Sequence, residues 1–428
     1  MSTELELLKK SRNVVPIGSF SSVRRGASPR PITDPKYFGG DVGWVRISDV
    51  TQRNKKYLRK TVQYVSPLGE SKSLRVNQGD IIMSICATVG KPMLVDMSAC
   101  IHDGFVQFYD LKEIDTEYLY YILGFHEQDF INRAQPGTQI NLNTTIVRNQ
   151  KVFFPPLPQQ RKIAKILSTC DEVIDKTESL IKKYEAMKEG LMHDLFTRGI
   201  DPKTKELRPK PQDAPELYKD SELGLIPKDW EVKELGKVCS ESGGNIQTGP
   251  FGSQLHAEDY KETGTPIITV EHLGDNEILH KNLPLVGSAD CQRLKKYQIL
   301  KGDLVFSRVG SIDRCAYVKD SEDGWLFSGR CLRVRMGSKR VNSKFYSYLL
   351  NNRPSRNWIL NHAVGSTMPC LNTQILSSLP VSKPCLVEQE LVKDKLDSIS
   401  NNSNLYRKDA LKWNSIKKGL LQDLLSGE

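Results

Sequence analysis

The chain has 428 residues, more than one ordinary domain holds, and this length predicts two or three domains. Its 61 lysines and arginines outnumber 51 aspartates and glutamates, and the net charge of +10 favours a polyanionic partner without requiring one. No apolar run approaches the ~20 residues that cross a bilayer, and the charged start from Met1 to Arg12 has no signal-peptide core. We therefore expect a cytoplasmic protein.

Residues 1–156 are predicted to form a short N-terminal helix, to about residue 14, followed by a sheet-rich domain. β-branched and aromatic residues between Gly, Pro and Asp indicate strands at 43–47, 80–85 and 152–154. Helical spacing of apolar residues at 117–123, after a cap at Thr116, predicts a helix. This domain is expected to be α/β (α+β), with sheet dominating.

Residues 157–199 are predicted to form one long helix. Its apolar residues recur at steps of three and four, which places a narrow stripe on one helix face, as in a coiled coil. The stripe consists of Ile163, Leu167, Cys170, Ile174, Thr177, Ile181 and Tyr184, then Leu191 and Leu195 after the charged Lys188.

A degenerate copy of this helix is predicted at residues 385–428. Gln160 and Gly190 align with Gln389 and Gly419, because 389 minus 160 and 419 minus 190 both give 229. The copy carries an equivalent stripe of Val392, Leu396, Ile399, Ser403, Tyr406, Ala410, Trp413, Lys417, Leu420 and Leu424. The matching stripes predict that the two helices face one another, antiparallel, or face a shared partner. Packing of each helix on its own domain is the ordinary alternative.

Residues 200–229 are rich in Pro, Lys and Asp and are predicted to be a linker. A second sheet-rich domain is expected at 230–384, with a helix at 342–350 and strands at 265–270, 303–307 and 332–335. Gly302-Asp303 repeats the Gly79-Asp80 strand start of the first domain, whereas the interiors of the two domains differ strongly. A shared scaffold with divergent loops is expected of two homologous modules, related by pseudo-twofold symmetry, that recognise different targets.

No catalytic or metal-binding motif is convincing. Phe154-Pro155-Pro156-Leu157 lacks the polar first residue and the final aromatic ring of the amino-methyltransferase tetrapeptide, and Gly90-Lys91 does not complete a Walker A sequence. The seven histidines contain no H-E-x-x-H motif, and the nine cysteines contain no C-x-x-C pair. The chain is therefore expected to perform no chemistry and to bind no metal.

Polar and basic loop residues are the candidates for DNA contact. Arg308 directly follows a predicted strand, so its guanidinium can reach guanine O6 and N7 or a phosphate. The equivalent loop of the first domain has no arginine but contains Lys91. The candidates in the first domain are Arg24, Arg25, Arg30, Arg46, Lys91, Gln139 and Asn141. Those in the second are Gln247, Thr248, Ser253, Gln254, His256, Arg308, Arg314, Ser366 and Thr367. For each basic residue the alternative is a solvated charge or a salt bridge.

Four segments together carry a family resemblance: PPLPQQRKIA at 155–164, GLMHDLF at 190–196, LGLIPKDW at 223–230 and GPFGS at 249–253. With them, the chain resembles the specificity subunit of type I restriction-modification systems. In the second copy the opening has decayed to KPCLVEQ at 383–389.

The resemblance implies a non-catalytic subunit with two target-recognition domains, each of which recognises one part of a bipartite asymmetric site in double-stranded DNA. The two stripes are the predicted helix-pair and docking residues: the helices would set the gap between the half-sites and bind two methyltransferase subunits, with restriction subunits as an optional addition. S-adenosylmethionine and ATP with magnesium would bind those partners, and this chain would need no cofactor. The rival hypotheses are a self-contained DNA-modifying enzyme and a coiled-coil adaptor that recognises no bases.

Overall fold

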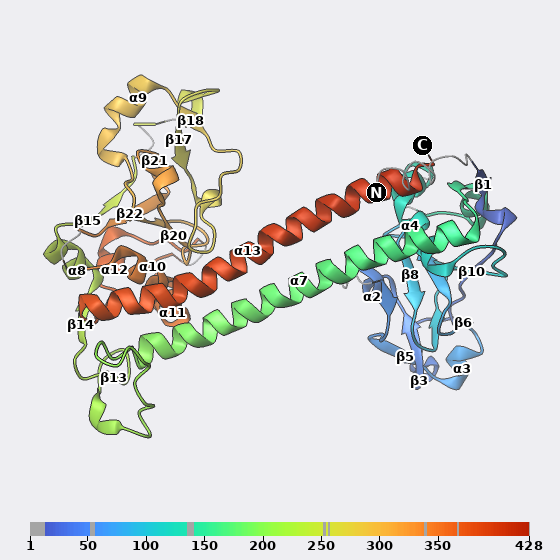
Figure 1. Cartoon of the computed structure of the whole chain (residues 1–428), viewed down its shortest axis with the longest axis horizontal. Helices are drawn as coiled ribbons and strands as arrows, with labels where there is room; N and C mark the ends of the chain where they lie inside the picture. The colour runs from blue at the N-terminus through green and yellow to red at the C-terminus, as the bar shows by residue number, and fades with distance from the viewer. Residues whose placement is uncertain are drawn as a thin grey trace. The chain divides into compact units, whose positions relative to one another are not determined.

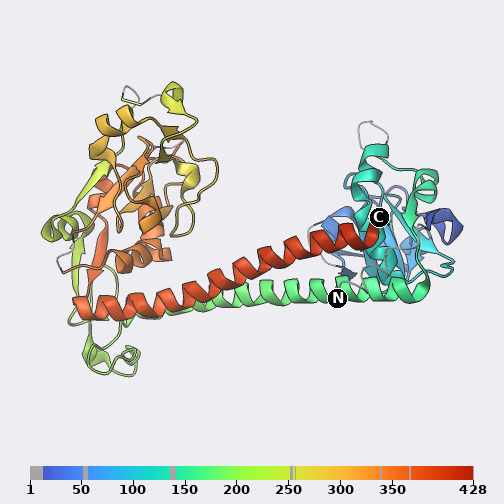
Figure 2. The same ribbon diagram turned by 45° about the horizontal axis from the view of Figure 1, so that its top comes forward.

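The computed structural model describes residues 13–51, 56–134, 141–250, 254–255, 257–337, 340–365 and 368–427. The chain divides into two compact units: unit 1 consists of residues 1–179 and 407–428, and unit 2 of residues 180–406. Two long helices, α7 (Leu157–Thr197) and α13 (Leu386–Leu425), each contribute residues to both units (Figures 1 and 2). In the part of the chain that the structure describes, no helix is long and apolar enough to cross a membrane.

Unit 1 contains two mixed sheets. The five-stranded sheet has the order β2 (Ser22–Arg25), β10 (Phe105–Tyr109), β7 (Ile81–Ser84), β8 (Pro92–Val95) and β4 (Tyr57–Leu58). The four-stranded sheet has the order β5 (Gln63–Val65), β3 (Phe38–Val45), β9 (Ala99–Ile101) and β6 (Leu74–Val76). Among the described residues of unit 1, β4–β8 and β3–β9 are the parallel pairs, and a separate antiparallel pair joins β1 (Val14–Pro16) to β11 (Lys151–Phe153). The helices of this domain are α2 (Ile47–Thr51), α3 (Pro67–Glu70), α4 (Thr116–Phe125), α5 (Glu127–Arg133) and α6 (Thr144–Asn149).

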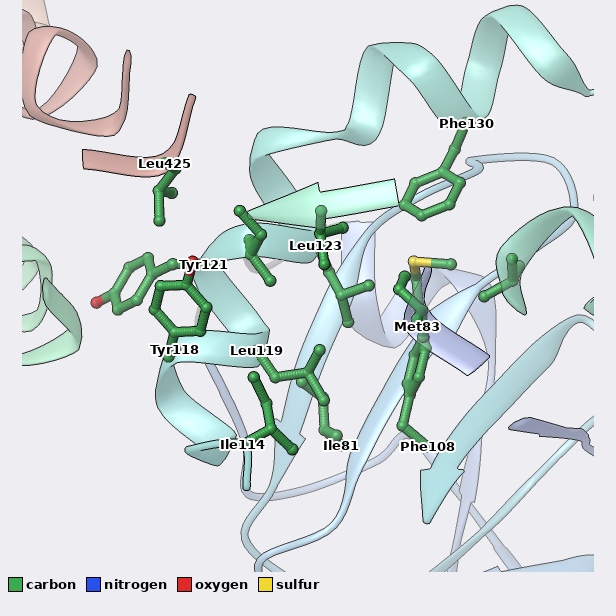
Figure 3. Close-up of a cluster of buried hydrophobic side chains, with 14 of the residues drawn as sticks. Ile81, Met83, Phe108, Ile114, Tyr118, Leu119, Tyr121, Leu123, Phe130 and Leu425 are labelled. Atoms are coloured by element: carbon green, nitrogen blue, oxygen red, sulfur yellow. The ribbon is translucent and has the colours of Figure 1, made fainter. Parts of the chain in front are cut away.

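Helix α4 covers the five-stranded sheet. Figure 3 shows Leu119 and Leu123 of α4 against Ile81 of β7 and Phe108 of β10, in a core that also buries Met83. The helix begins after Asp115, whose carboxylate accepts a hydrogen bond from the Tyr118 amide, so the prediction of a cap at Thr116 is wrong by one residue. Aspartate supplies a stronger acceptor to the unpaired amides of the first turn.

Two other predictions for the first domain need correction. The strand predicted to continue to Ile47 ends at Val45, because the Asp49 carboxylate accepts hydrogen bonds from the amides of Arg46 and Val62 and turns the chain into α2. The N-terminal helix falls outside the described residues up to Arg12, and Val14 lies in strand β1, where it pairs with Phe153.

Unit 2 repeats the main sheet of unit 1. Its order is β15 (Asn245–Thr248), β22 (Cys331–Arg335), β19 (Leu304–Ser307) and β20 (Cys315–Tyr317), which matches β2, β10, β7 and β8. The pair β14 (Glu231–Glu234) and β23 (Pro380–Lys383) matches β1 and β11. A second sheet has the order β16 (Tyr260–Lys261), β18 (Leu285–Val286), β17 (Thr265–Ile268) and β21 (Leu326–Phe327). The helices are α8 (Leu235–Ser242), α9 (Ser288–Arg293), α10 (Ser343–Asn351), α11 (Arg353–His362) and α12 (Thr373–Ser377). The predicted fold class and duplication are therefore confirmed.

The segment that follows α7 packs firmly in unit 2. It contains the short strands β12 (Tyr218–Lys219) and β13 (Ile226–Pro227), and the buried Arg208 forms an ion pair with the buried Glu388 of α13. The Trp230 indole also donates to Glu388, at 2.9 Å. Residues 200–229 are thus held by α13, which the linker composition did not predict.

In each unit the two long helices run antiparallel. Ile163 and Leu167 share the core of unit 1 with Leu424 and Leu425, and Asp171 forms an ion pair with Lys417 at 2.5 Å. In unit 2 the rings of Tyr184 and Tyr406 lie 5.4 Å apart, while Leu195 shares a core with Val392 and Leu396.

The expectation that each stripe faces the other helix instead of its own domain is wrong near the helix ends. There the stripe residues also pack among sheet and α4 or α10 side chains. Apolar residues that recur every three or four positions form a broad stripe on the helix surface. One such stripe can therefore contact both the other long helix and the domain.

Candidate nucleic-acid interface

In unit 2, the ends of three strands and one loop meet. The Arg308 amide, just after β19, donates to Arg330 O just before β22 at 2.8 Å, and the Gly249 amide, just after β15, donates to Cys331 O at 3.2 Å. The Leu371 amide donates to Arg308 O at 2.8 Å, which places the segment 368–371 beside the same strand ends. We call Thr248, Arg308, Arg314, Arg330 and Cys370 the second strand-end surface.

Three arginines belong to this surface. The Arg308 guanidinium donates to Gly329 O at 3.3 Å. Arg314, whose carbonyl accepts from the Ser307 amide, and Arg330 are exposed and make no side-chain hydrogen bond or ion pair among the described residues. Exposed guanidinium groups at strand ends can bind base edges or phosphates. Arg330 was not among the predicted candidates, although it lies only two residues before the strand predicted at 332–335.

Unit 1 builds an equivalent surface on the same scaffold. The Ile85 amide donates to Gly104 O and the Leu142 amide to Ile85 O, both at 2.8 Å, and Cys86 pairs with Asn141. These contacts correspond to those of Arg308, Leu371, Val309 and Cys370 in unit 2. We call Arg25, Arg30, Arg46, Asp103 and Asn141 the first strand-end surface.

An acidic side chain distinguishes the first surface. Asp103 accepts hydrogen bonds from Ser28 and Arg30, each at 2.8 Å, and its carbonyl accepts from Arg25 at 2.6 Å. Burial raises the pKa of Asp103, but the Ser28 hydrogen bond and the charge of Arg30 outweigh it, so the net pKa is lowered and the carboxylate stays ionised. Arg46 is exposed, and its side chain makes no hydrogen bond or ion pair within the described ranges.

Two further basic candidates of unit 1 have partners within the domain. Arg24 donates to Gln107 at 2.8 Å, with its guanidinium 4.7 Å from the centre of the Tyr109 ring. Lys91 forms an ion pair with Glu127 at 2.8 Å, on a side chain that is partly exposed. Lys91 therefore forms a salt bridge, which was the alternative to a DNA contact for this residue.

Unit 2 has an arginine and a glutamine at the strand positions equivalent to Arg24 and Gln107, but the two residue types are exchanged between the strands. Gln247 of β15 stands opposite Arg333 of β22, as Arg24 of β2 stands opposite Gln107 of β10. The buried Arg333 donates to the Gln247 amide oxygen at 2.6 Å, and burial lowers the pKa of Arg333 to about 10. The Gln247 amide oxygen is thus engaged within the domain.

The remaining candidates fall into two groups. The Gln254 side-chain oxygen accepts from the Tyr297 hydroxyl at 2.8 Å, and its backbone oxygen accepts from Arg293 at 2.8 Å. Other candidates lie outside the described residues: Gln139, Ser253, His256, Ser366 and Thr367.

The apolar residues that the long helices expose differ from the predicted stripes. The stripe residues predicted to pair the helices are all at least half-buried. The buried ones are Ile163, Leu167, Ile174, Leu195, Val392, Leu396 and Leu424, and the half-buried ones are Ile181, Tyr184, Ile399, Tyr406 and Trp413. The large apolar side chains that α7 and α13 expose include Leu180, Met187, Leu405, Leu411 and Ile416. Leu411 is the most exposed of these, at 72%. Periodicity finds buried positions, so it could not indicate these residues.

Within the described part of the chain, no group of three or more His, Cys, Asp or Glu side chains is arranged to hold a metal ion.

Both halves of the chain match one known family. Residues 10–186 and 227–412 match the type I restriction modification DNA specificity domain. This chain belongs to that family. It is a specificity subunit of the type I restriction-modification kind, with the domain present twice. We call the sheet-rich part of each unit its recognition domain.

Similar proteins agree with this assignment over nearly the whole chain. The type I restriction enzyme MjaVIII specificity subunit of Methanocaldococcus jannaschii is 24% identical and is matched over 97% of this chain and 92% of its own length. The MjaIX specificity subunit of the same organism is 23% identical, over 100% and 95%. The solved S subunit of a type I system from M. genitalium is 15% identical, covers 96% of this chain and 95% of its own, and has a TM-score of 0.60. This last likeness shows a shared fold.

Proposed function

We propose that this specificity subunit recognises a bipartite asymmetric site in double-stranded DNA, one half-site per recognition domain, and performs no chemistry itself. The observation that carries the proposal is the pair of strand-end surfaces, built by the same backbone hydrogen bonds but with different side chains. Three arginines occupy the second surface, whereas Asp103 engages Arg25 and Arg30 on the first. Two surfaces of different charge on one scaffold suit the recognition of two different base sequences.

We further propose that α7 and α13 set the gap between the half-sites and bind two methyltransferase subunits. Helix α7 has 41 residues and is about 61 Å long at ~1.5 Å per residue. A duplex turn is about 34 Å, so a helix of this length suits recognition of separate major-groove segments. The exposed Leu405, Leu411 and Ile416 of α13 supply apolar surface for a partner. In this proposal S-adenosylmethionine, and ATP with magnesium where restriction subunits join, bind those partners.

The deciding experiment maps methylated sites in the host genome with and without this chain. A bipartite methylated motif that disappears on deletion supports the proposal, and an unchanged set of methylated sites contradicts it. Methyl transfer to DNA by the purified chain alone would instead favour a self-contained enzyme. Unchanged site choice after replacement of residues 230–384 by another recognition domain would favour an adaptor that recognises no bases.

Arg308→Ala tests the second strand-end surface directly. If Arg308 contacts a base, the substitution costs about 1–3 kcal/mol of DNA binding and relaxes selection at one position. If it contacts a phosphate, binding weakens for every sequence and the slope of log K against log salt falls by about 1. Arg353→Ala is the matched control, because Arg353 is an exposed arginine at the opposite end of α11 from the segment 368–371. Equal DNA binding by the two variants would show that Arg308 is not part of the DNA interface.

A further inference from the structure

A buried glutamine joins each recognition domain to the first turn of the long helix that follows it. Gln160 of α7 accepts from the Asp115 amide at 2.8 Å and donates to Glu113 O and Pro155 O at 2.9 and 2.8 Å. Gln389 of α13 accepts from the Asn342 amide and donates to Pro384 O, both at 2.8 Å. The duplicated glutamines therefore perform the same structural task in both units.

A buried tyrosine makes a second connection further along the same helix. In unit 1, Tyr121 of α4 donates to Asp171 of α7 at 2.6 Å. In unit 2, Tyr348 of α10 donates to Asp397 of α13 at 2.6 Å, and Ser400 Oγ lies 3.3 Å from the same hydroxyl. Burial, followed by the hydrogen bond to Asp171, raises the pKa of Tyr121, so this hydroxyl stays a donor.

In each unit the other long helix also contacts this tyrosine–aspartate pair. Lys417 of α13 forms an ion pair with Asp171 at 2.5 Å, on the carboxylate that accepts from Tyr121. Lys188 of α7 lies 5.6 Å from the centre of the Tyr348 ring. A lysine of the domain also faces each tyrosine ring: Lys56 at 4.6 Å from Tyr121, and Lys344 at 5.2 Å from Tyr348. Domain and both helices thus meet at one tyrosine–aspartate contact per unit.

Two separated contacts fix the direction of a recognition domain on its long helix, whereas a single contact does not. Gln160 and Asp171 are 11 positions apart (171 minus 160), or about 16 Å along α7. Gln389 and Asp397 are 8 positions apart (397 minus 389), or about 12 Å along α13. Leu167 is the last α7 residue in the apolar cluster that unit 1 forms with its main sheet and α4, one turn before Asp171, although Cys170 and Ile174 are also buried. Apolar contact is non-directional, whereas a hydrogen bond to a carboxylate fixes both distance and angle.

We propose that the Tyr121–Asp171 and Tyr348–Asp397 hydrogen bonds are positioning contacts that hold each recognition domain at a fixed direction on its long helix, and so determine how strictly the complex selects the number of base pairs between the half-sites. This inference rests on the proposed recognition of a bipartite site. One added base pair moves a half-site by about 3.4 Å and turns it by about 34° around the duplex. A domain held at two points resists that turn, and a domain held at one point accommodates it.

Removal of one oxygen atom tests the proposal. Tyr121→Phe and Tyr348→Phe delete the hydrogen bonds and leave the rings in place. The matched controls are Tyr120→Phe and Tyr346→Phe, because among the described residues neither hydroxyl makes a hydrogen bond. Asp171→Asn keeps an oxygen that accepts from Tyr121 but removes the ion pair with Lys417, which separates the two connections at this carboxylate.

The measurement uses the full chain in complex with its methyltransferase subunits. Methylation rates are compared on duplexes with the mapped gap and with gaps one base pair longer or shorter. We expect each Tyr→Phe variant to raise the off-gap to native-gap rate ratio roughly tenfold, the factor that corresponds to a lost hydrogen bond to a charged acceptor. The native-gap rate should change little, and the two controls should keep the wild-type ratio.

Two outcomes would overturn the inference while leaving the proposed function intact. One is a rate ratio that equals that of the controls. The other is a lower native-gap rate with an unchanged ratio, which would assign the tyrosines a merely structural role. A wild-type complex that methylates without any dependence on the gap would instead contradict the proposed bipartite recognition, and this inference with it.

Discussion

Removal of the Glu388 carboxylate should open the segment that follows α7. Glu388 accepts from four donors: Arg208 Nη1 at 2.5 Å and Nη2 at 3.1 Å, Trp230 Nε1 at 2.9 Å, and the Ile200 amide at 2.8 Å. Its side chain is fully buried and that of Arg208 is 8% exposed. Glu388→Ala leaves the buried guanidinium without its buried partner, and such losses cost about 3–5 kcal/mol.

The assay is hydrogen–deuterium exchange read by mass spectrometry, because it follows each unit separately. Peptides covering 199–209 and 226–232 should exchange about 10²–10³ times faster in Glu388→Ala, at one factor of ten per 1.4 kcal/mol. Peptides covering 81–95 of unit 1 provide the internal reference.

Two controls define the cause. Asp229→Ala removes the other partner of Arg208, but the Asp229 side chain is 58% exposed, so the expected cost is below about 1 kcal/mol. The double variant Glu388→Leu with Arg208→Met should recover part of the protection, because an apolar pair replaces the buried ion pair while the Trp230 indole and the Ile200 amide still lack their acceptor. Unchanged exchange at 199–209 in Glu388→Ala would refute the reasoning.

Three further outcomes are expected. The rings of Tyr184 and Tyr406 face each other at 5.4 Å, so seven residues inserted after each tyrosine keep the helices in register and lengthen both by about 10.5 Å. The gap between the methylated half-sites should then lengthen by about three base pairs. An unchanged gap would exclude the helix pair as the spacer. Leu411→Glu should abolish co-purification with the methyltransferase subunit, whereas Leu223→Glu, an exposed leucine of the 200–229 segment, should not. Burial lowers the pKa of Lys344 to about 8 from 10.5, so the unfolded chain binds more protons between these values and the stability of unit 2 should rise with pH across that window. Urea unfolding of Lys344→Met should show less of this rise than the wild type, and equal slopes would contradict the assigned burial effect.

The main strands and helices were predictable because their signals are local. The runs at 303–307 and 332–335 became β19 and β22 within one residue, since β-branched and aromatic residues suit a half-buried pleated surface wherever they occur. Strand ends were less predictable. Ile47 entered a helix because Asp49 binds two backbone amides, one of them 13 residues away at Val62.

Sequence patterns indicated several residues of the two strand-end surfaces but not how these surfaces are built. The loops after β7 and β19 lie beside the segments that begin at 141 and 368, a contact that residue spacing did not predict. Which side chains remain open was not predictable, because Lys91 meets Glu127 and Arg24 meets Gln107 only after the chain has folded.

The sequence by itself determined the duplication, the two long helices and the absence of recognisable catalytic motifs, because each follows from residue spacing along the chain. Only the tertiary structure decided which charges are engaged and which elements hold each domain on its helices. Glu388 and Arg208 are 180 positions apart, and Tyr121 and Asp171 are 50 apart. The physical reason is that an ion pair or a hydrogen bond depends on distances of a few ångströms in space, and the fold, not the order of residues, sets those distances.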